Sequence, residues 1–355
     1  MRRTSFRAIV SAVIAALCLP LMAANRHDGV EPLTKEFKND TISQLTKEMK
    51  AVYFFTDVVP KVEQDLNARN AAGEYDSLTT GPDFAKKLTA DMNAICHDAH
   101  LRVRFSENVL PIRKNNEEPS AEEIKKQKRW GELMNGGFQQ AQRMDGNIGY
   151  IELTGFIDRQ QFEKPAQAAM AFIANTDALI LDLRHNGGGD PASVQYLCSY
   201  LFDKRTHLND IEMRGQGKTE FWTQKVPGKS FADKPVYVLT SKRTGSGAEE
   251  CAYDIQSLHR GTIVGESTWG GANPGQMVRL NDHFGVFIPQ GRAMNPYTHT
   301  NWEGVGVKPD VAVAADDALK TAHLALVKEL LAKATTPDDK ARLTDVLDEL
   351  TKAPN

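Results

Sequence analysis

Residues 236–250 have the sequence VYVLTSKRTGSGAEE, and this stretch decides the fold. Its first four residues form a short apolar run that predicts a buried strand, and a helical pattern follows at 248–258. A second stretch, ALILDLRHNGGGD at 178–190, has the same order of apolar strand and glycine-containing turn, and a helical pattern follows at 192–202. Two such units predict a central α/β sheet whose functional groups lie at the carboxyl ends of its strands.

Further segments extend this sheet and add helices at both ends. Residues 137–144 and 148–153 flank a turn-rich tripeptide and predict a hairpin. Residues 41–103 have helical periodicity interrupted by prolines, which predicts a bundle of about three helices. We therefore expect a helical bundle at 31–105, a charged linker at 106–135, an α/β core at 136–314 and amphipathic helices at 315–355.

The first 24 residues have the order of a secretory signal peptide. Three arginines within the first seven residues precede an apolar run at 8–19, and small residues at 23 and 24 offer a cleavage site. We expect cleavage near Ala24 and a periplasmic or secreted mature protein without stable membrane insertion. An uncleaved membrane anchor is the alternative, because it has the same composition.

Charge and cysteine content narrow the class of protein further. The formal net charge of -3 over 355 residues offers no basic excess for a phosphate backbone, so we expect no nucleic-acid partner. Removal of the signal peptide leaves Cys96, Cys198 and Cys251, an odd number that permits at most one disulfide. We expect these side chains to act as small buried apolar groups.

Ser246 is the first candidate for chemistry, because it follows a predicted strand directly and precedes a predicted helix. In that position a hydroxyl is held in the open, and the free N–H of Gly247 could stabilise an oxyanion. A simple helix N-cap is the alternative, since serine often has that role. The glycine turn at 187–189 could present N–H groups to a ligand, but it lacks the lysine of a phosphate-binding loop.

A serine nucleophile needs a base, and the sequence offers nine histidines. His97 and His100 are spaced like residues one helical turn apart, so a metal pair is one alternative. No further cluster of ligands with suitable spacing accompanies them, and we expect neither metal nor cofactor. A histidine that is solvent-facing or part of the core is the other alternative.

Four motifs together resemble the tail-specific, C-terminal-processing serine protease family. They are DLRHNGGG at 182–189, VYVLTSKRTGSGAEE at 236–250, RGTIVGESTWGGANPG at 260–275 and PYTHTNWEGVGVKPDV at 296–311. The likeness is greatest to the branch related to interphotoreceptor retinoid-binding protein, with a core that is similar to that of tricorn protease. This resemblance implies a Clp-protease/crotonase-like α/β core.

The resemblance also implies site residues. Ser246 would be the nucleophile, and the oxyanion hole would consist of the N–H groups of Gly247 and of Gly188 or Gly189. Many family members have a lysine base at the position of Gly271, so that dyad is not available here.

A tricorn-like arrangement is implied instead, with His100 as base and Glu303 orienting it. Ala99 stands where tricorn protease has an additional serine. The stretch from 103 to 148 is too short for the PDZ domain that is usual in the family.

These features predict a peptidase that hydrolyses polypeptides through an acyl-enzyme on Ser246. A non-catalytic module that binds apolar ligands or peptides on the same fold is the alternative, since fold alone does not give function. An esterase is a third possibility, because the same triad cleaves both types of bond. The oligomeric state is left open.

If the signal peptide is removed as expected, the mature protein begins near Asn25. Intact-mass measurement of the exported protein checks this, because loss of residues 1–24 changes the mass by a defined amount. Recovery of the full-length chain from the cytoplasm would contradict the prediction.

Overall fold

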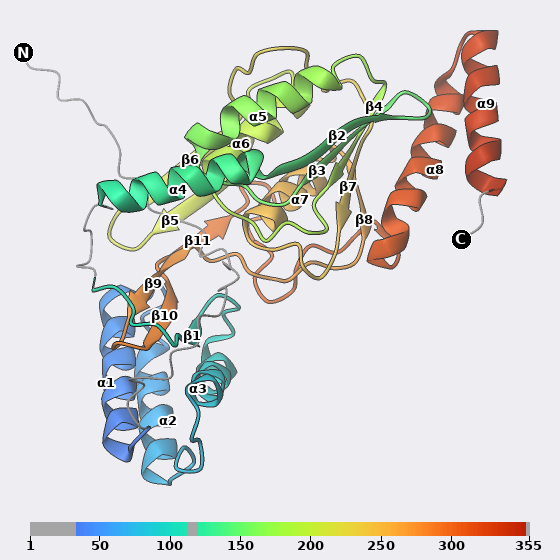
Figure 1. The fold of residues 1–355 in the computed structure, drawn as a ribbon. Helices are drawn as coiled ribbons and strands as arrows, with labels where there is room; N and C mark the ends of the chain where they lie inside the picture. Colours follow the sequence, from blue (N-terminus) through green and yellow to red (C-terminus); the bar gives the residue numbers. More distant parts are fainter. Residues whose placement is uncertain (1–32, 113–119, 353–355) are drawn as a thin grey trace, which may run out of the picture.

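The computed structural model describes residues 33–112 and 120–352. Figure 1 shows an N-terminal group of helices, a sheet core and a C-terminal helical pair. The predicted signal peptide at 1–24 lies outside the described residues. Within the described ranges, no helix is long and apolar enough to cross a membrane.

The N-terminal helices are α1 (Lys35–Val52), α2 (Val59–Ala71) and α3 (Gly81–Cys96), in agreement with the predicted number. Thr34 and Thr80 cap α1 and α3 by accepting hydrogen bonds from backbone N–H groups. The apolar stripes expected from helical spacing are buried: Ile42, Leu45, Met49, Phe84, Leu88 and Met92. These helices therefore share one hydrophobic core.

A small antiparallel sheet completes this core. It has the order β1 (Arg102–Phe105), β10 (Phe284–Pro289) and β9 (Gly275–Arg279). Val103 pairs with Val286, and both side chains are buried among the helices. Two of the three strands thus come from within the range expected for the α/β core, and in Figure 1 this sheet lies between the N-terminal helices and that core.

Part of the segment expected to be a charged linker is a helix, α4 (Ala121–Leu133). Ser120 and Glu123 form a reciprocal capping box at its N-terminus. Only Gly131 of α4 is buried, so the helix lies on the surface.

The core is a six-stranded sheet of order β12-β8-β7-β4-β3-β2. The pair β2–β3 is antiparallel and the remaining neighbours are parallel. The strands are β2 (Phe138–Met144), β3 (Ile148–Leu153), β4 (Ala178–Asp182), β7 (Val236–Thr240), β8 (Thr262–Gly265) and β12 (Val311–Ala312). The α/β sheet predicted from the two strand-turn-helix units is confirmed.

Helices cover both faces of this sheet (Figure 1). Leu179 and Leu181 of β4 pack with α5 (Arg159–Phe172), α6 (Pro191–Cys198) and α7 (Gly247–Ser257) on one face. Ala178 and Ile180 point to the other face, because side chains alternate along a strand. That face is covered by α8 (Ala315–Lys333), against which α9 (Pro337–Lys352) packs.

A third sheet has the order β11 (Gly291–Met294), β5 (His207–Met213) and β6 (Gly217–Trp222). The three cysteines of the described ranges, Cys96, Cys198 and Cys251, are free thiols. Cys198 in α6 and Cys251 in α7 are buried with their Sγ atoms 3.8 Å apart, and Cys96 is partly exposed. Two of the three therefore fill the apolar core as expected.

Candidate active site

Two loops meet at the carboxyl ends of the adjacent parallel strands β4 and β7. Parallel neighbours end at the same edge of a sheet, so the loops that follow them are brought together. The Thr244 hydroxyl donates to the carbonyl of Leu183 at 2.8 Å, and the Gly245 N–H donates to the carbonyl of Asn186 at 3.0 Å. These bonds hold the glycine turn against the residue that precedes Ser246.

Ser246 lies between this loop and the first turn of α7, as the sequence predicts. Its backbone has φ 50° and ψ -120°, a conformation that residues other than glycine rarely adopt. Such strain persists only where the surroundings hold it, and it occurs most often at functional sites. Ser246 therefore differs from an ordinary N-cap, which has extended backbone angles.

Glu249, one turn further along α7, holds this conformation. Its buried carboxylate accepts hydrogen bonds from the N–H of Ser246 at 2.7 Å, the hydroxyl of Thr268 at 2.6 Å and the N–H groups of Gly270 and Gly271 at 2.5 and 3.0 Å. Burial raises the pKa of Glu249 to about 7, although these donors favour its charged form. Sequence reasoning missed Glu249, but the spacing Ser-x-x-Glu is that of a capping box.

The glycine turn supplies a second free N–H beside Ser246. The N–H of Gly188 donates to the Asn186 side chain at 2.8 Å, so it is already in use. The N–H groups of Gly189 and Gly247 make no hydrogen bond to any other described residue. A Cβ added at Gly247 would lie 3.1 Å from the Gly189 nitrogen, so the two donors are close together. Of the two glycines that the sequence left open, Gly189 is the one with a free donor.

His100 lies on the loop between α3 and β1. α3 ends at Cys96, and His97 caps it with a left-handed φ of 51°. The two histidines are therefore not on one helical turn, and the helical metal pair considered from their spacing does not form. The Nδ1 of His100 is buried without a hydrogen-bond partner among the described residues.

The environment of His100 disfavours its charged form. Burial lowers its pKa to about 4, and the positive charges of Arg102 and Arg104 act in the same direction. The imidazole is consequently neutral at physiological pH, which is the form that accepts a proton.

Glu303 lies beside His100, as the resemblance implies. One of its oxygens accepts a hydrogen bond from the N–H of Ala99 at 2.7 Å, and the other accepts from the N–H groups of Ala272 at 2.6 Å and Asn273 at 3.2 Å. Burial raises its pKa, and these donors offset part of the effect. One carboxylate oxygen of Asp98, one of Glu303 and a ring nitrogen of His100 all lie within 4.8 Å of one another.

Asp98 is a second buried carboxylate that sequence reasoning missed. It accepts hydrogen bonds from the hydroxyl of Tyr53 at 3.2 Å, the side-chain amide of Asn273 at 3.1 Å and the N–H of His100 at 3.1 Å. Burial raises its pKa to about 7, and the negative charge of Glu303 contributes. Asp98 therefore joins α1, the histidine loop and the core.

Gly271 leaves the space that His100 occupies. A Cβ at position 271 would lie 2.7 Å from the Cε1 of His100, a distance that real contacts do not show. A lysine at this position would therefore displace the imidazole. The absence of the lysine and the presence of the histidine are two parts of one steric arrangement.

Trp269 contacts both halves of the site. Its ring centroid lies 4.8 Å from that of His100 in an edge-on arrangement, and a Cβ added at Gly245 would lie 3.1 Å from the indole. No hydrogen bond between the Ser246 hydroxyl and the His100 imidazole occurs in the described part of the chain. The structure thus brings Glu303 and His100 together and places the serine in a neighbouring loop.

Two groups of side chains have the composition of a metal site within the described residues. The first is Asp98, His100 and Glu303, in which both carboxylates already accept hydrogen bonds from fixed donors. In the second, His207 contacts Asp210 at 2.7 Å, and the Lys218 ammonium lies 3.0 Å from the same carboxylate. The oxygens of both carboxylates in the first group are thus held by protein donors beside the imidazole, whose Nδ1 is not hydrogen-bonded to a described residue.

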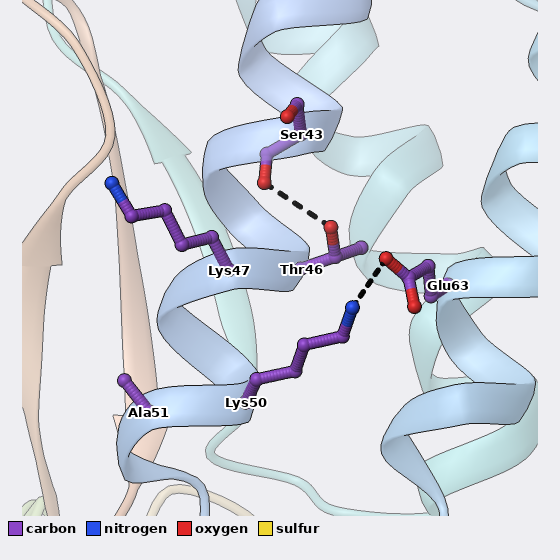
Figure 2. Close-up of a pocket in the computed structure, with 6 residues that line it drawn as sticks. All are labelled: Ser43, Thr46, Lys47, Lys50, Ala51 and Glu63. Atoms are coloured by element: carbon purple, nitrogen blue, oxygen red, sulfur yellow. Dashed lines mark hydrogen bonds and ion pairs between the residues drawn. The ribbon is translucent and has the colours of Figure 1, made fainter.

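A hollow of about 450 Å³ lies elsewhere, on the surface between α1 and α2. Figure 2 shows its lining, in which the Lys50 ammonium is paired with Glu63. Ser43, Thr46, Lys47 and Ala51 complete the lining. None of the residues of the candidate site contributes to it.

A strained serine next to two unbonded N–H groups, and a neutral imidazole beside a carboxylate, are groups of the kind that serine hydrolases use. Comparisons with known proteins identify the family. Residues 147–313 match the model of peptidase family S41, and residues 33–138 match the N-terminal domain of that family in eukaryotic IRBP. The chain belongs to peptidase family S41, and its Clp-protease/crotonase-like core is confirmed.

Relatives share only part of their length with this chain. Carboxyl-terminal-processing peptidase 2, chloroplastic, from Arabidopsis thaliana is 29% identical over 46% of this chain and 31% of its own. Tricorn protease from Thermoplasma volcanium is 28% identical over 48% of this chain and 16% of its own. Among solved structures, a lipoprotein from Streptococcus agalactiae has the same fold, with a TM-score of 0.53 and 13% sequence identity. The match covers 85% of this chain and 99% of the lipoprotein chain. The chain thus spans about a third of the length of the first curated relatives.

Replacing Gly188 by alanine should strongly reduce turnover of a substrate. Gly188 has φ +103°, and a Cβ there would lie 2.7 Å from both the Gly247 nitrogen and the Ser246 Cβ. The neighbouring Gly187 is the matched control, because nothing lies within 4 Å of its added Cβ. We expect Gly187→Ala to retain activity within about threefold and Gly188→Ala to lose on the order of 100-fold in kcat. Equal activities of the two folded variants would contradict this geometry.

Proposed function

We propose that this chain is a serine peptidase that hydrolyses peptide bonds through an acyl-enzyme on Ser246. The observation that carries the proposal is the strained serine beside the unbonded N–H groups of Gly189 and Gly247. His100 is the base, and Glu303 orients it. The names of relatives, which include processing peptidases, support a polypeptide substrate.

The steps follow from the chemistry of these groups. Neutral His100 takes the proton of the Ser246 hydroxyl as the oxygen attacks the peptide carbonyl. The N–H groups of Gly189 and Gly247 stabilise the oxyanion that forms. The imidazolium then gives its proton to the leaving amine, and water hydrolyses the acyl-enzyme with His100 again as base.

The reaction requires a contact that the described structure does not contain. The Ser246 hydroxyl and the His100 ring must come within hydrogen-bonding reach, and Trp269 packs against the surroundings of both. A rearrangement of the Trp269 side chain on substrate binding would permit this approach. Catalytic hydrogen bonds often become short only when substrate is bound.

Export to the periplasm or the medium is part of the proposal, on the basis of the predicted signal peptide. The alternative function remains a module that binds apolar ligands or peptides without catalysis. The fold alone is compatible with both functions. Strained backbone at Ser246 favours the enzyme, because a binding module has no use for an unfavourable conformation at that residue.

Triad variants test the proposal directly. Ser246→Ala should abolish both labelling by a fluorophosphonate probe and hydrolysis of a denatured polypeptide. His100→Ala should reduce kcat on the order of 1,000-fold, because the base is lost. Glu303→Gln should cost less, because orientation and charge stabilisation are disturbed while the base remains.

His97→Ala is the matched control for the base. His97 is an exposed helix cap, and its replacement should leave hydrolysis nearly unchanged. If His97→Ala abolished hydrolysis while folded His100→Ala retained it, the base would be assigned to the wrong histidine. If Ser246→Ala still reacted with the probe, the proposal of a Ser246 acyl-enzyme would be refuted.

The pH profile of kcat/KM should have an acid limb well below pH 6.5, the ordinary histidine pKa. The base must be neutral, and a pKa lowered to about 4 keeps the imidazole neutral in mildly acidic solution. Protonation of His100 alone should therefore leave activity at pH 5.5 close to that at pH 7, whereas protonation of Glu249 or Asp98, each with a pKa raised to about 7, would lower it in that range. Initial rates at low substrate concentration between pH 4 and 9, for wild type and Glu303→Gln, separate the two. A midpoint at or above pH 6.5 that Glu303→Gln moves to lower pH would show that Glu303 stabilises the imidazolium more than burial opposes it.

A further inference from the structure

One face of the small sheet presents two arginines beside the candidate base. Arg102 and Arg104 alternate with Val103 along β1, and Val103 is buried among the N-terminal helices. The two arginine side chains therefore lie on the opposite face of the sheet and are exposed. His100, two residues before Arg102, has its ring against Phe287, whose Cα pairs with that of Arg102.

Neither arginine has a carboxylate partner within the described ranges. The Arg102 guanidinium lies 4.7 Å from the centre of the Trp269 ring, and its Nε donates to the carbonyl of Ala99 at 2.7 Å. Arg104 makes no hydrogen bond or ion pair to a described residue. By contrast, Arg279 on the same face of the sheet is paired with Asp282.

This arrangement is electrostatically unfavourable as it stands. The pKa of Arg102 is lowered first by partial desolvation and then by the charge of Arg104, although the side chain remains exposed. Within the described ranges the two like charges have no carboxylate partner, and a bound anion would relieve their repulsion. Local arrangements of this kind, which conflict with stability, are typical of functional sites.

The same face also offers apolar contacts for an extended chain. Phe287 pairs across the strands with Met277, whose side chain is 38% exposed. Trp269, partly exposed, connects Arg102 to His100. An anionic group bound by the two guanidinium groups would thus lie next to apolar surface and close to the reacting groups.

We propose that Arg102 and Arg104 bind a carboxylate of the polypeptide substrate and thereby select where the chain is cleaved. Guanidinium groups match a carboxylate in geometry, since each offers parallel N–H donors. The carboxylate belongs either to an Asp or Glu side chain or to the C-terminus of the substrate. This inference rests on the proposed peptidase function.

A peptide library tests the inference. The wild-type protein is incubated with synthetic decapeptides that have random residues at every position, prepared once with a free C-terminal acid and once with a C-terminal amide. Cleavage products are sequenced by mass spectrometry. We expect either enrichment of Asp and Glu at a fixed position from the cleaved bond, which identifies a side chain, or preferential cleavage of the acid library, which identifies the terminus.

Charge reversal gives the decisive comparison. Arg104→Glu should remove the preference for the carboxylate and favour Lys or Arg at the same position, with a change in relative kcat/KM on the order of tenfold or more. Arg102→Gln should weaken the preference without inverting it. Arg279→Gln is the matched control, because its guanidinium is already paired, and it should leave the preference unchanged.

The outcomes separate this inference from the function on which it rests. Labelling of Ser246 by the fluorophosphonate probe reports the nucleophile and should be retained in every arginine variant. Intact labelling with peptide cleavage that shows no carboxylate preference, or a preference that Arg104→Glu leaves unchanged, would overturn the arginine site alone. If the wild-type protein were not labelled by the probe, or cleaved no peptide, the peptidase function would be overturned and the inference with it.

Discussion

The hydrogen bonds to one buried carboxylate, that of Glu249, are the constraint on which the site depends. They fix the strained backbone of Ser246 and, through Thr268, Gly270 and Gly271, the loop that passes beside the histidine. A buried carboxylate destabilises the fold unless its oxygens accept hydrogen bonds. The loop at 268–271 and the start of α7 must therefore stay in the positions in which they donate to Glu249. One side chain thus couples Ser246, the proposed nucleophile, to the loop that lies beside His100, the proposed base.

The sheet provides the rest of the positioning. The parallel strands β4 and β7 are neighbours and end at the same edge of the sheet, so their pairing alone brings the glycine turn and the serine loop together. His100 comes from the loop that follows the N-terminal helices. Its N–H donates to Asp98, and Asp98 in turn accepts hydrogen bonds from Tyr53 and Asn273, which hold the loop in place. Two adjacent backbone N–H groups of one core loop, those of Ala272 and Asn273, and the N–H of Ala99 in the histidine loop donate to Glu303, which completes the connection.

Much of the sheet core and the position of the serine loop can be predicted from the sequence, because apolar periodicity and glycine turns indicate local structure. The buried strand at 178–182, the helix at 315–333 and the loop position of Ser246 follow from such patterns. The proximity of Glu303 to His100 could be predicted only from the family resemblance, because the two residues are 203 positions apart in the sequence.

The strands β9 and β10 belong to a sheet with β1, and the choice between the N–H groups of Gly188 and Gly189 depends on Asn186. Both are tertiary contacts, which local patterns do not encode.

The contribution of β9 and β10 to the N-terminal core has a consequence during biosynthesis. The ribosome completes the three helices long before it reaches residues 275–289, so the hydrophobic core at the N-terminus must wait for its last wall. Until then the histidine loop has no Asn273 to hold Asp98 and no Glu303 beside the imidazole. A nascent chain would therefore lack the assembled site, and the proposed peptidase activity would arise only when folding is complete.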